Sequence, residues 1–480
     1  MHMKKPNVVL ILVDDMGWMD LSCQGSKFYE TPNIDRLARE GMRFSNAYAS
    51  CPVCSPTRAS ILTGKYPARL GLTHYINSNP AHYNGTMENG KLLGVPYVPY
   101  MSTREKSLAS ALKQHGYRTW HVGKWHLGKE EYWPLNHGFD VNIGGCDKGH
   151  PSGRGHYFPP WEIPTIQPKE GDNFLTDRLG DEAADLILKN DDSPFFLNMW
   201  FYAVHTPVQA KPEKIRKYEQ KAKDMGLDKI DPFVKGDFFP SEHKKTQRIE
   251  RRIVQSNPAY AGLIEHLDEN VGKILDALEK KGVTDNTIVI FTSDNGGLST
   301  AESSPTCNAP LLEGKGWMYD GGVREPLIIK WPGKIKSESI SDSVITSCDF
   351  YPTILEACGL PLENQQHMDG KSFLPALTGK EFDRGPIFWH FPHYANQGGT
   401  PGCAIRKGDW KLIEFFEHGI ELYNLKDDIG EKHNLAPTQP EIAEELKSEL
   451  HRWLKEMNAL VPARNPDWKP WRDCDLNPLD

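Results

Sequence analysis

The sequence predicts an α/β fold: a large mixed, mostly parallel β-sheet sandwiched by helices, followed by a smaller antiparallel sheet packed by one helix. Two observations lead to this prediction. Apolar, strand-like runs alternate with helical segments over most of the chain, which is typical of a parallel sheet covered by helices. After about residue 380 the alternation stops, and short strand-like runs follow one another between turns. We therefore predict a larger domain over residues 1–380 and a smaller one over residues 381–480.

The elements of the larger domain follow in order. Residues 7–13, "NVVLILV", form a continuous apolar run that fits a strand buried on both faces. Residues 31–41 predict a helix, because Thr31 suits the N-cap, Pro32 the first helical position and Gly41 the position after the end. The alternation continues with helices predicted at 107–116, 175–190, 259–281 and 349–358, and strands at 117–123, 194–205, 287–297 and 326–333.

The smaller domain is predicted from four short runs and one helical segment. The runs are "PIFWHF", "CAIRKG", "WKLIEFF" and "IELYNL", which lie at residues 386–391, 403–408, 410–416 and 420–425. A helix predicted at 439–458 closes the chain. Short strands joined by turns indicate an antiparallel sheet.

Composition excludes several classes of function. The 480 residues carry a net charge of −8 and no block of lysines and arginines, so nucleic acid is not an expected partner. The apolar run "VVLILV" is far too short to span a bilayer, and we predict no membrane span. No secretory signal is recognisable, and the opening "MHM" is typical of an added segment that replaces a leader. The nine cysteines are scattered and odd in number, unlike a disulfide scaffold.

Polar residues follow four of the predicted strands. In parallel sheets, functional groups collect beyond the carboxyl ends of the strands. The groups are Asp14-Asp15, the run from Gly123 to His126, His205, and Asp294-Asn295. The oxygen ligands among them suit calcium or magnesium better than zinc, and three carboxylates in one pocket need a cation to offset their repulsion. The alternative is that each group is a solvated turn, as the Asp-Asn-Gly-Gly sequence from residue 294 would also allow.

The segment "CPVCSPTRASILTG" at residues 51–64 leaves three interpretations open. Cys51 and Cys54 could form half of a zinc site, but the chain has no other Cys-x-x-Cys pair. They could form a redox pair at the start of a helix. Alternatively, Cys54 alone is functional: Pro56 fits a first helical turn and Thr63-Gly64 a helix end, which puts Cys54 where a helix favours negative charge.

At these residues the sequence resembles the type I, formylglycine-dependent sulfatases, which belong to the alkaline-phosphatase-like superfamily. Within this family it resembles bacterial carbohydrate sulfatases. The run from Cys54 to Arg58 with Thr63-Gly64 resembles the family signature. The segments "NVVLILVDDMGW", "GYRTWHVGKWHLG", "TSDNGG" and "GKGWMYDGGVREPLIIKWPG" resemble its other motifs in the family order. "AIRKGDWKLI" and "ELYNLKDD" are similar to C-terminal segments of bacterial members.

The resemblance implies a role for each matching residue. Cys54 would be oxidised to formylglycine by a maturation enzyme, and its hydrated aldehyde would be the nucleophile. One Ca²⁺ ion would be held by Asp14, Asp15, Asp294, Asn295 and the modified Cys54. Arg58 and Lys124 would brace the nucleophile, and Lys315 would bind sulfate. His205 would act as the general acid and His126 as the base that expels sulfate. The alternatives are that His205 is a structural histidine, that Lys315 is a loop lysine and that Lys124 and His126 are packed beside Trp125.

The substrate is less constrained by the sequence. The insert at residues 74–100 is aromatic and polar, a composition common in loops that face sugars. By resemblance, His74, His390 and His393 would contact substrate; the alternative for the latter two is that they pack the two domains together. We expect an exo-acting carbohydrate sulfatase that removes O-sulfate from a glycosaminoglycan or a marine galactan, with galactose or N-acetylgalactosamine 4-sulfate preferred, in a periplasmic or secreted location.

Two alternatives to this function remain. The first is an aryl sulfatase, or a phosphonate or phosphodiester hydrolase of the same superfamily. The second is a catalytically silent glycan-binding protein, which would apply if Cys54 is never oxidised.

Overall fold

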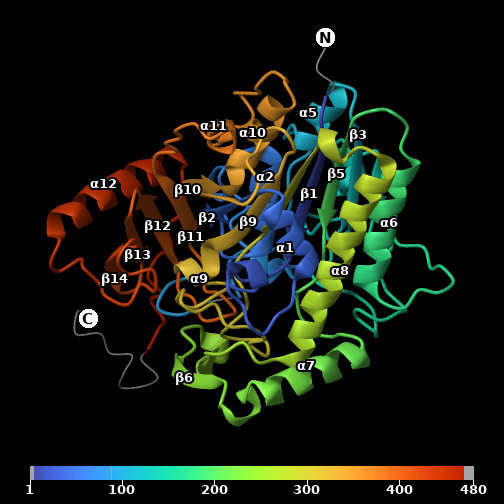
Figure 1. Ribbon diagram of the computed structural model, residues 1–480. Coiled ribbons are helices and arrows are strands. Elements are labelled where there is room, and N and C mark those ends of the chain that lie inside the picture. The colour runs from blue at the N-terminus through green and yellow to red at the C-terminus, as the bar shows by residue number, and fades with distance from the viewer. Residues whose placement is uncertain (1–4, 88, 470–480) are drawn as a thin grey trace.

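The computed structural model describes residues 5–87 and 89–469 (Figure 1). Within these residues an eight-stranded sheet forms the centre of the molecule, in the spatial order β10-β2-β9-β8-β1-β5-β3-β4. Its strands are β1 (Asn7–Val13), β2 (Met42–Tyr48), β3 (Arg118–Gly123), β4 (Val141–Ile143), β5 (Phe195–Trp200), β8 (Thr287–Ser293), β9 (Arg324–Lys330) and β10 (Ser339–Thr346). Strand β9 is antiparallel to both of its neighbours, and the other pairings in this sheet are parallel. The sheet is therefore mixed and mostly parallel, which confirms the prediction.

Strand β1 lies in the middle of the sheet and is buried throughout. Alternate residues of a strand point to opposite faces, so Val9, Ile11 and Val13 join one core and Val8, Leu10 and Leu12 the other. Helices α1 (Pro32–Arg39), α6 (Leu175–Lys189) and α8 (Pro258–Lys281) contribute to the first core, and α2 (Cys54–Thr63), α5 (Leu108–Gln114) and α10 (Phe350–Ala357) to the second. Burial on both faces explains why the strand has no polar alternation.

Some elements differ from the prediction. The strands predicted to reach residues 205 and 297 end at Trp200 and Ser293. The edge strand β10 was not predicted, because half-exposed Ser and Asp residues interrupt its apolar pattern. Strands β2 and β4, helix α7 (Pro212–Asp224) and the hairpin of β6 (Phe233–Phe238) and β7 (Arg248–Arg252) were also not predicted. The remaining short helices are α3 (Pro67–Leu70), α4 (Pro80–Tyr83), α9 (Asp320–Val323) and α11 (Leu374–Leu377).

Helix α1 begins where predicted but is capped by a different residue. Thr31 occupies the N-cap position, yet its side chain makes no capping hydrogen bond. Instead, the carboxylate of Asp268 in α8 accepts hydrogen bonds from the backbone N–H groups of Asn33 (3.0 Å) and Ile34 (2.8 Å). The cap therefore also fixes α1 against α8, a contact that local sequence cannot reveal.

The smaller sheet has the predicted architecture. Its strands β11 (Ile387–Phe391), β12 (Gly402–Lys407), β13 (Trp410–Phe415) and β14 (Gly419–Asn424) pair antiparallel in chain order, and α12 (Pro440–Glu456) packs on them. Trp453 of α12 stacks on Phe388 at 4.8 Å between ring centroids. A shared apolar cluster that includes Tyr48 and Trp389 joins the two sheets, so the domain boundary at residue 380 stays a prediction. In the part of the chain that the structure describes, no helix has the length and apolar character needed to cross a membrane.

A buried group of charges also connects the two sheets. The Lys411 ammonium of β13 lies 2.8 Å from a carboxylate oxygen of Asp320 and 2.8 Å from one of Glu431, and all three side chains are fully buried. The Tyr48 hydroxyl donates to the other oxygen of Asp320 (2.9 Å). Asp320 is the first residue of α9, five positions after Lys315. The smaller sheet thus fixes the segment that carries Lys315.

We predict that Lys411→Met lowers the free energy of unfolding by about 3–5 kcal/mol, because it removes the cation paired with the buried Glu431 and leaves the buried Asp320 with Arg324 at 3.3 Å. Urea unfolding followed by far-UV circular dichroism measures this. The matched control is Lys407→Met on the neighbouring strand, where the exposed ion pairs with Glu445 and Glu449 contribute little. Equal shifts of the unfolding midpoint in the two variants would contradict the prediction.

Candidate active site

The polar residues beyond four strands of the main sheet meet in one place. Asp14 and Asp15 follow β1, Lys124 follows β3, His205 lies beyond β5, and Asp294 and Asn295 follow β8. Strands β8, β1, β5 and β3 are consecutive in the sheet and run parallel, so their carboxyl ends share one edge. This edge is where the sequence predicted a site.

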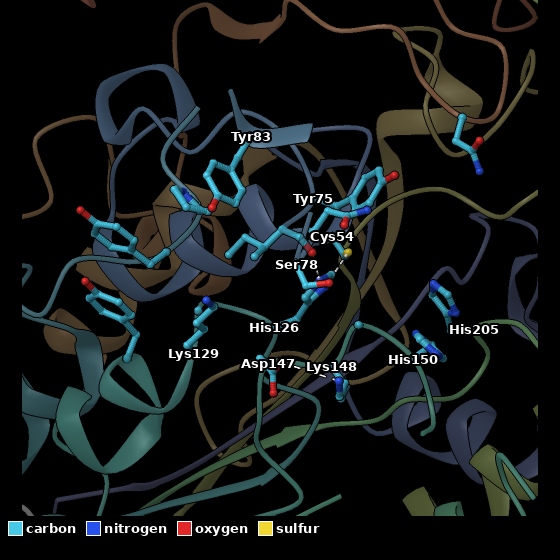
Figure 2. Close-up of a pocket in the computed structure, with 18 of the residues that line it drawn as sticks. Cys54, Tyr75, Ser78, Tyr83, His126, Lys129, Asp147, Lys148, His150 and His205 are labelled. Atoms are coloured by element: carbon cyan, nitrogen blue, oxygen red, sulfur yellow. Dashed lines mark hydrogen bonds and ion pairs between the residues drawn. The ribbon is translucent and has the colours of Figure 1, made fainter. Parts of the chain in front are cut away.

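Cys54 is the first residue of α2, as predicted, and α2 ends at Thr63, followed by Gly64 with a left-handed φ of 68°. Its Sγ lies 3.3 Å from Nδ1 of His126 (Figure 2). Cys51 is buried among apolar side chains, and both cysteines are free. The geometry therefore favours the interpretation in which Cys54 alone belongs to the site.

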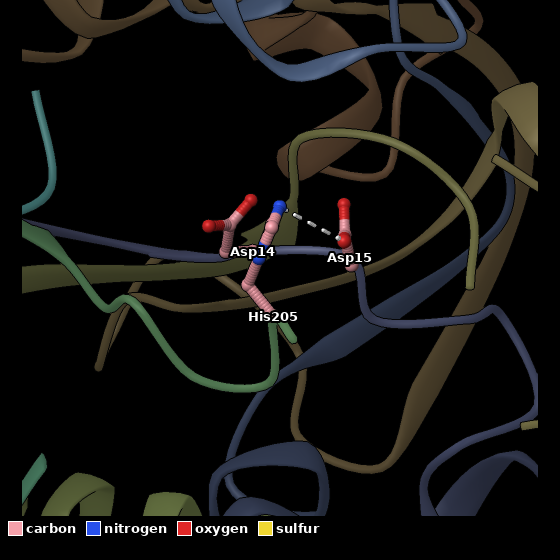
Figure 3. A group of neighbouring side chains, drawn as sticks. All are labelled: Asp14, Asp15 and His205. Atoms are coloured by element: carbon pink, nitrogen blue, oxygen red, sulfur yellow. Dashed lines mark ion pairs between the residues drawn. The ribbon is translucent and has the colours of Figure 1, made fainter. Parts of the chain in front are cut away.

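Three acidic and three basic side chains form close ion pairs around Cys54. Lys124 donates to Asp14 (2.7 Å), Lys315 to Asp15 (2.8 Å), and Arg58 through Nε to Asp294 (2.8 Å). Apart from Asp15, Lys315 and His205, these side chains are essentially excluded from solvent. Figure 3 shows a further contact of this group, in which Nε2 of His205 points toward Asp15 at 3.6 Å. In addition, Nη2 of Arg58 lies 3.6 Å from Oδ1 of Asp14.

One observation indicates that these residues fit a hard cation. Oδ1 of Asp14 and Oδ1 of Asn295 are buried oxygen atoms with no hydrogen-bond partner. Buried acceptors are normally satisfied, so two unsatisfied ones at the same strand edge need an explanation. Ligand atoms of Asp14, Cys54 and Asp294 also lie within 4.8 Å of one another. Carboxylate and amide oxygens are the ligands that calcium and magnesium prefer.

The acid–base state of the carboxyl groups points the same way. Burial, reinforced by the neighbouring acids, raises the pKa of Asp14 and of Asp294 to about 6. Burial also raises the pKa of Asp15, but the electrostatic interactions with Lys315, His205 and Lys124 outweigh it and hold this pKa below its usual range. An added cation would stabilise the charged form of Asp14 and Asp294.

The backbone at the site adopts conformations that need support from the surrounding structure. Asp15 (φ 63°) and His126 (φ 57°) are non-glycine residues in the left-handed region. At Gly296, a Cβ atom would lie 1.8 Å from the carbonyl oxygen of Gly321. Only glycine fits there, and this close approach lets the segment that carries Lys315 reach the site.

Backbone carbonyls fix the tautomers of the two histidines. A carbonyl only accepts, so Nε2 of His126 donates to Ile76 O (2.8 Å) and its Nδ1 presents a lone pair to residue 54. In the same way Nδ1 of His205 donates to Thr206 O (2.7 Å), and its Nε2 accepts from Lys315 at 3.2 Å. Burial, with Lys315 as the next cause, lowers the pKa of His205 to about 3, and burial also lowers the pKa of His126. Both rings are neutral in this state.

A cavity of about 480 Å³ opens above Cys54, His126, His205 and Lys315. Figure 2 places Cys54 and His126 in its middle, His150 and His205 on one side, and Tyr83 and Lys129 on the other. The predicted sugar-facing insert forms much of the wall. The wall residues that we did not predict individually are Tyr75, Tyr83, Tyr100, Lys129, Glu131, Tyr132, Asp147, Lys148, His150, Glu302, Asn396 and Gln397.

The three histidines predicted to contact substrate do not line this cavity. His74 is buried and stacks on His393 at 4.6 Å between ring centroids, and Nε2 of His393 lies 2.8 Å from the Thr73 hydroxyl. His390 is a buried residue of β11, and burial lowers its pKa to about 4. The contact with His74 favours the packing alternative for His393, whereas His390 lies near Phe416 of its own domain.

Comparison with known proteins identifies the family. The sulfatase family model matches residues 6–360, and a model for the C-terminal region of N-sulphoglucosamine sulphohydrolase matches residues 312–459. A sulfatase of Formosa agariphila is 33% identical over 95% of this chain and 90% of its own length, and human N-acetylgalactosamine-6-sulfatase is 33% identical over 96% and 87%. The chain belongs to the sulfatase family and is a sulfuric ester hydrolase.

Solved structures agree with the sequence comparison. The crystal structure of Ps i-CgsB superimposes with a TM-score of 0.75 at 28% identity, covering 97% of this chain and 94% of that one. The same protein has been solved in complex with k-i-k-neocarrahexaose. The alkaline-phosphatase-like fold expected from the sequence is confirmed.

Proposed function

We propose that this enzyme removes O-sulfate from a terminal galactose or N-acetylgalactosamine residue of a sulfated glycan. One observation carries the proposal: Asp14, which has an unsatisfied oxygen, offers a ligand atom within 4.8 Å of Cys54, and Cys54 lines a cavity rich in tyrosine. Relatives named N-acetylgalactosamine-6-sulfatase and a solved relative bound to neocarrahexaose support a galactose-type sugar. The 4-sulfate expected from the sequence stays a prediction, and the relatives add the 6-sulfate as a second candidate.

The cavity supports a sugar rather than a flat aryl group. Tyr75, Tyr83, Tyr100 and Tyr132 contribute to its walls, and Tyr100 stacks on Tyr132 at 4.2 Å. Such side chains combine an apolar face with a hydroxyl, which suits a ligand that is apolar on its faces and polar at its rim. A cavity of about 480 Å³ has room for a small ligand, which supports an exo mode of action.

The residues that would hold calcium are Asp14, Asp15, Asp294, Asn295 and the modified Cys54. Calcium would supply positive charge against the carboxylates and the sulfate, and formylglycine at position 54 would supply the nucleophilic hydroxyl. Arg58, Lys124 and Lys315 add positive charge around the sulfate position, where negative charge develops during sulfate transfer.

His126 and His205 have different roles in the proposed mechanism. The lone pair of His126 Nδ1 faces residue 54, so His126 is placed to remove a proton from a hydroxyl there. The protonated Lys315 ammonium lies in the cavity and donates a hydrogen bond to the neutral His205. We therefore assign protonation of the leaving oxygen to the Lys315–His205 pair: the Lys315 ammonium supplies the proton to Nε2 of His205, and His205 passes it to the leaving oxygen as the general acid.

The first experiment measures sulfate release from a panel of 4- and 6-sulfated galactose and N-acetylgalactosamine, an aryl sulfate and a phosphodiester. The protein is first matured with a formylglycine-generating enzyme, and intact mass confirms the loss expected when the thiol becomes an aldehyde. We expect the highest kcat/KM on a sulfated sugar, and no release with Cys54→Ala. Preference for the aryl sulfate or the phosphodiester would contradict the proposal, and an unmodified Cys54 would indicate a glycan-binding protein.

We predict that Lys124→Ala and His205→Ala each lower kcat by about 10²–10³, the usual loss when a group that stabilises a developing charge is removed. The controls are Lys280→Ala and His433→Ala, which change exposed residues of the same types. Turnover near the wild-type value in either site variant would refute its role.

The family resemblance also supports a periplasmic or secreted location and a maturation enzyme as transient partner. Location is tested by fractionating cells that express the native gene.

A further inference from the structure

Glu302 is a cavity residue to which the mechanism above gives no role. It lies in the loop between β8 and α9 and lines the cavity together with His205 and Lys315. It also lines an adjoining depression with His150 and Thr206. The carboxylate is therefore close to the place where the sulfated sugar would sit.

The carboxylate is held by two side chains from the smaller domain. Its Oε1 accepts hydrogen bonds from the side-chain amides of Asn396 (2.8 Å) and Gln397 (2.8 Å), which lie between β11 and β12. Its Oε2 has one weak contact, at 3.5 Å from the Thr206 hydroxyl. Within the described residues Glu302 forms no ion pair within 4 Å. One oxygen thus orients the group, and the other keeps acceptor capacity and negative charge.

The backbone that presents Glu302 is itself strained. Glu302 (φ 51°), Ser303 (φ 76°) and Ser304 (φ 40°) are three consecutive non-glycine residues in the left-handed region. Such conformations persist only where the surrounding structure imposes them. Here the buried Arg252 of β7 donates through Nε to Ser304 O (2.5 Å), and its backbone N–H donates to Ser299 O (2.8 Å).

We propose that Glu302 is a specificity-determining residue that accepts a hydrogen bond from a free hydroxyl of the sulfated sugar and rejects a second sulfate on that sugar. This inference rests on the proposed function. A carboxylate that only accepts hydrogen bonds complements a donating hydroxyl, whereas it repels an anion and leaves it without a donor. The substrate class is then a monosulfated galactose-type sugar, and not one that carries two sulfates.

The test compares kcat/KM for N-acetylgalactosamine 4-sulfate, its 6-sulfate and the 4,6-disulfate in wild type and Glu302→Gln. The glutamine carbonyl can still accept from Asn396 and Gln397, and thermal melting confirms that the variant is folded. We expect wild type to favour its monosulfated substrate over the disulfate by at least about tenfold. We expect Glu302→Gln to reduce that preference by about tenfold, the effect of a change of about 1.4 kcal/mol in transition-state binding.

The matched control is Glu131→Gln, the same change at another carboxylate of the cavity wall. Glu131 is two residues after Lys129, which lies on the side of the cavity away from His205 in Figure 2. An unchanged preference in Glu302→Gln, or an equal change in Glu131→Gln, would overturn the assignment to Glu302. No release of sulfate from any of the sugars by the matured wild type would instead overturn the proposed function.

Discussion

The structure around the site depends on one electrostatic constraint: three carboxylates lie buried together at one edge of a parallel sheet. Asp14, Asp15 and Asp294 are brought there by β1 and β8, which pair along their whole length. Arg58, Lys124 and Lys315 pair with these three carboxylates one for one, but oxygens of Asp14 and Asn295 stay without a hydrogen-bond partner. A cation bound beside Cys54 would satisfy those oxygens and make the cavity floor positive, which would suit an anionic sulfate ester.

The rest of the molecule holds the parts of this cluster in register. The network of Lys411, Asp320 and Glu431 attaches the smaller sheet to α9 and so fixes Lys315. Asn396 and Gln397, from the same sheet, orient Glu302 on the cavity wall. The smaller sheet and its β11–β12 loop therefore contact residues of the candidate site, although none of the proposed metal ligands belongs to them.

Much of the main sheet and the floor of the site could be predicted from the sequence, because both follow from local patterns. Continuous apolar runs identified the buried strands, and acids directly after two of them identified the end of the sheet where the candidate site lies. The helix beginning at Cys54 was predicted from Pro56 and Gly64. The edge strand β10 carries no such pattern, since its half-exposed residues are polar.

The cavity walls could not be predicted in the same way, because loops from distant parts of the chain form them. Glu302, Asn396 and Gln397 come together only through tertiary packing. The same limit applies to His390 and His393: their sequence neighbourhood resembles a substrate-facing segment, but the fold directs both side chains into the protein interior. Asp268, which caps α1 from 235 residues away, is a further case.

The most direct test is a crystal structure of the matured protein grown with calcium, with anomalous scattering used to locate the ion. We predict one ion coordinated by Oδ1 of Asp14 and Oδ1 of Asn295 and in contact with residue 54. An ion bound elsewhere, or an ion-free site in which protein groups satisfy both oxygens, would contradict the account.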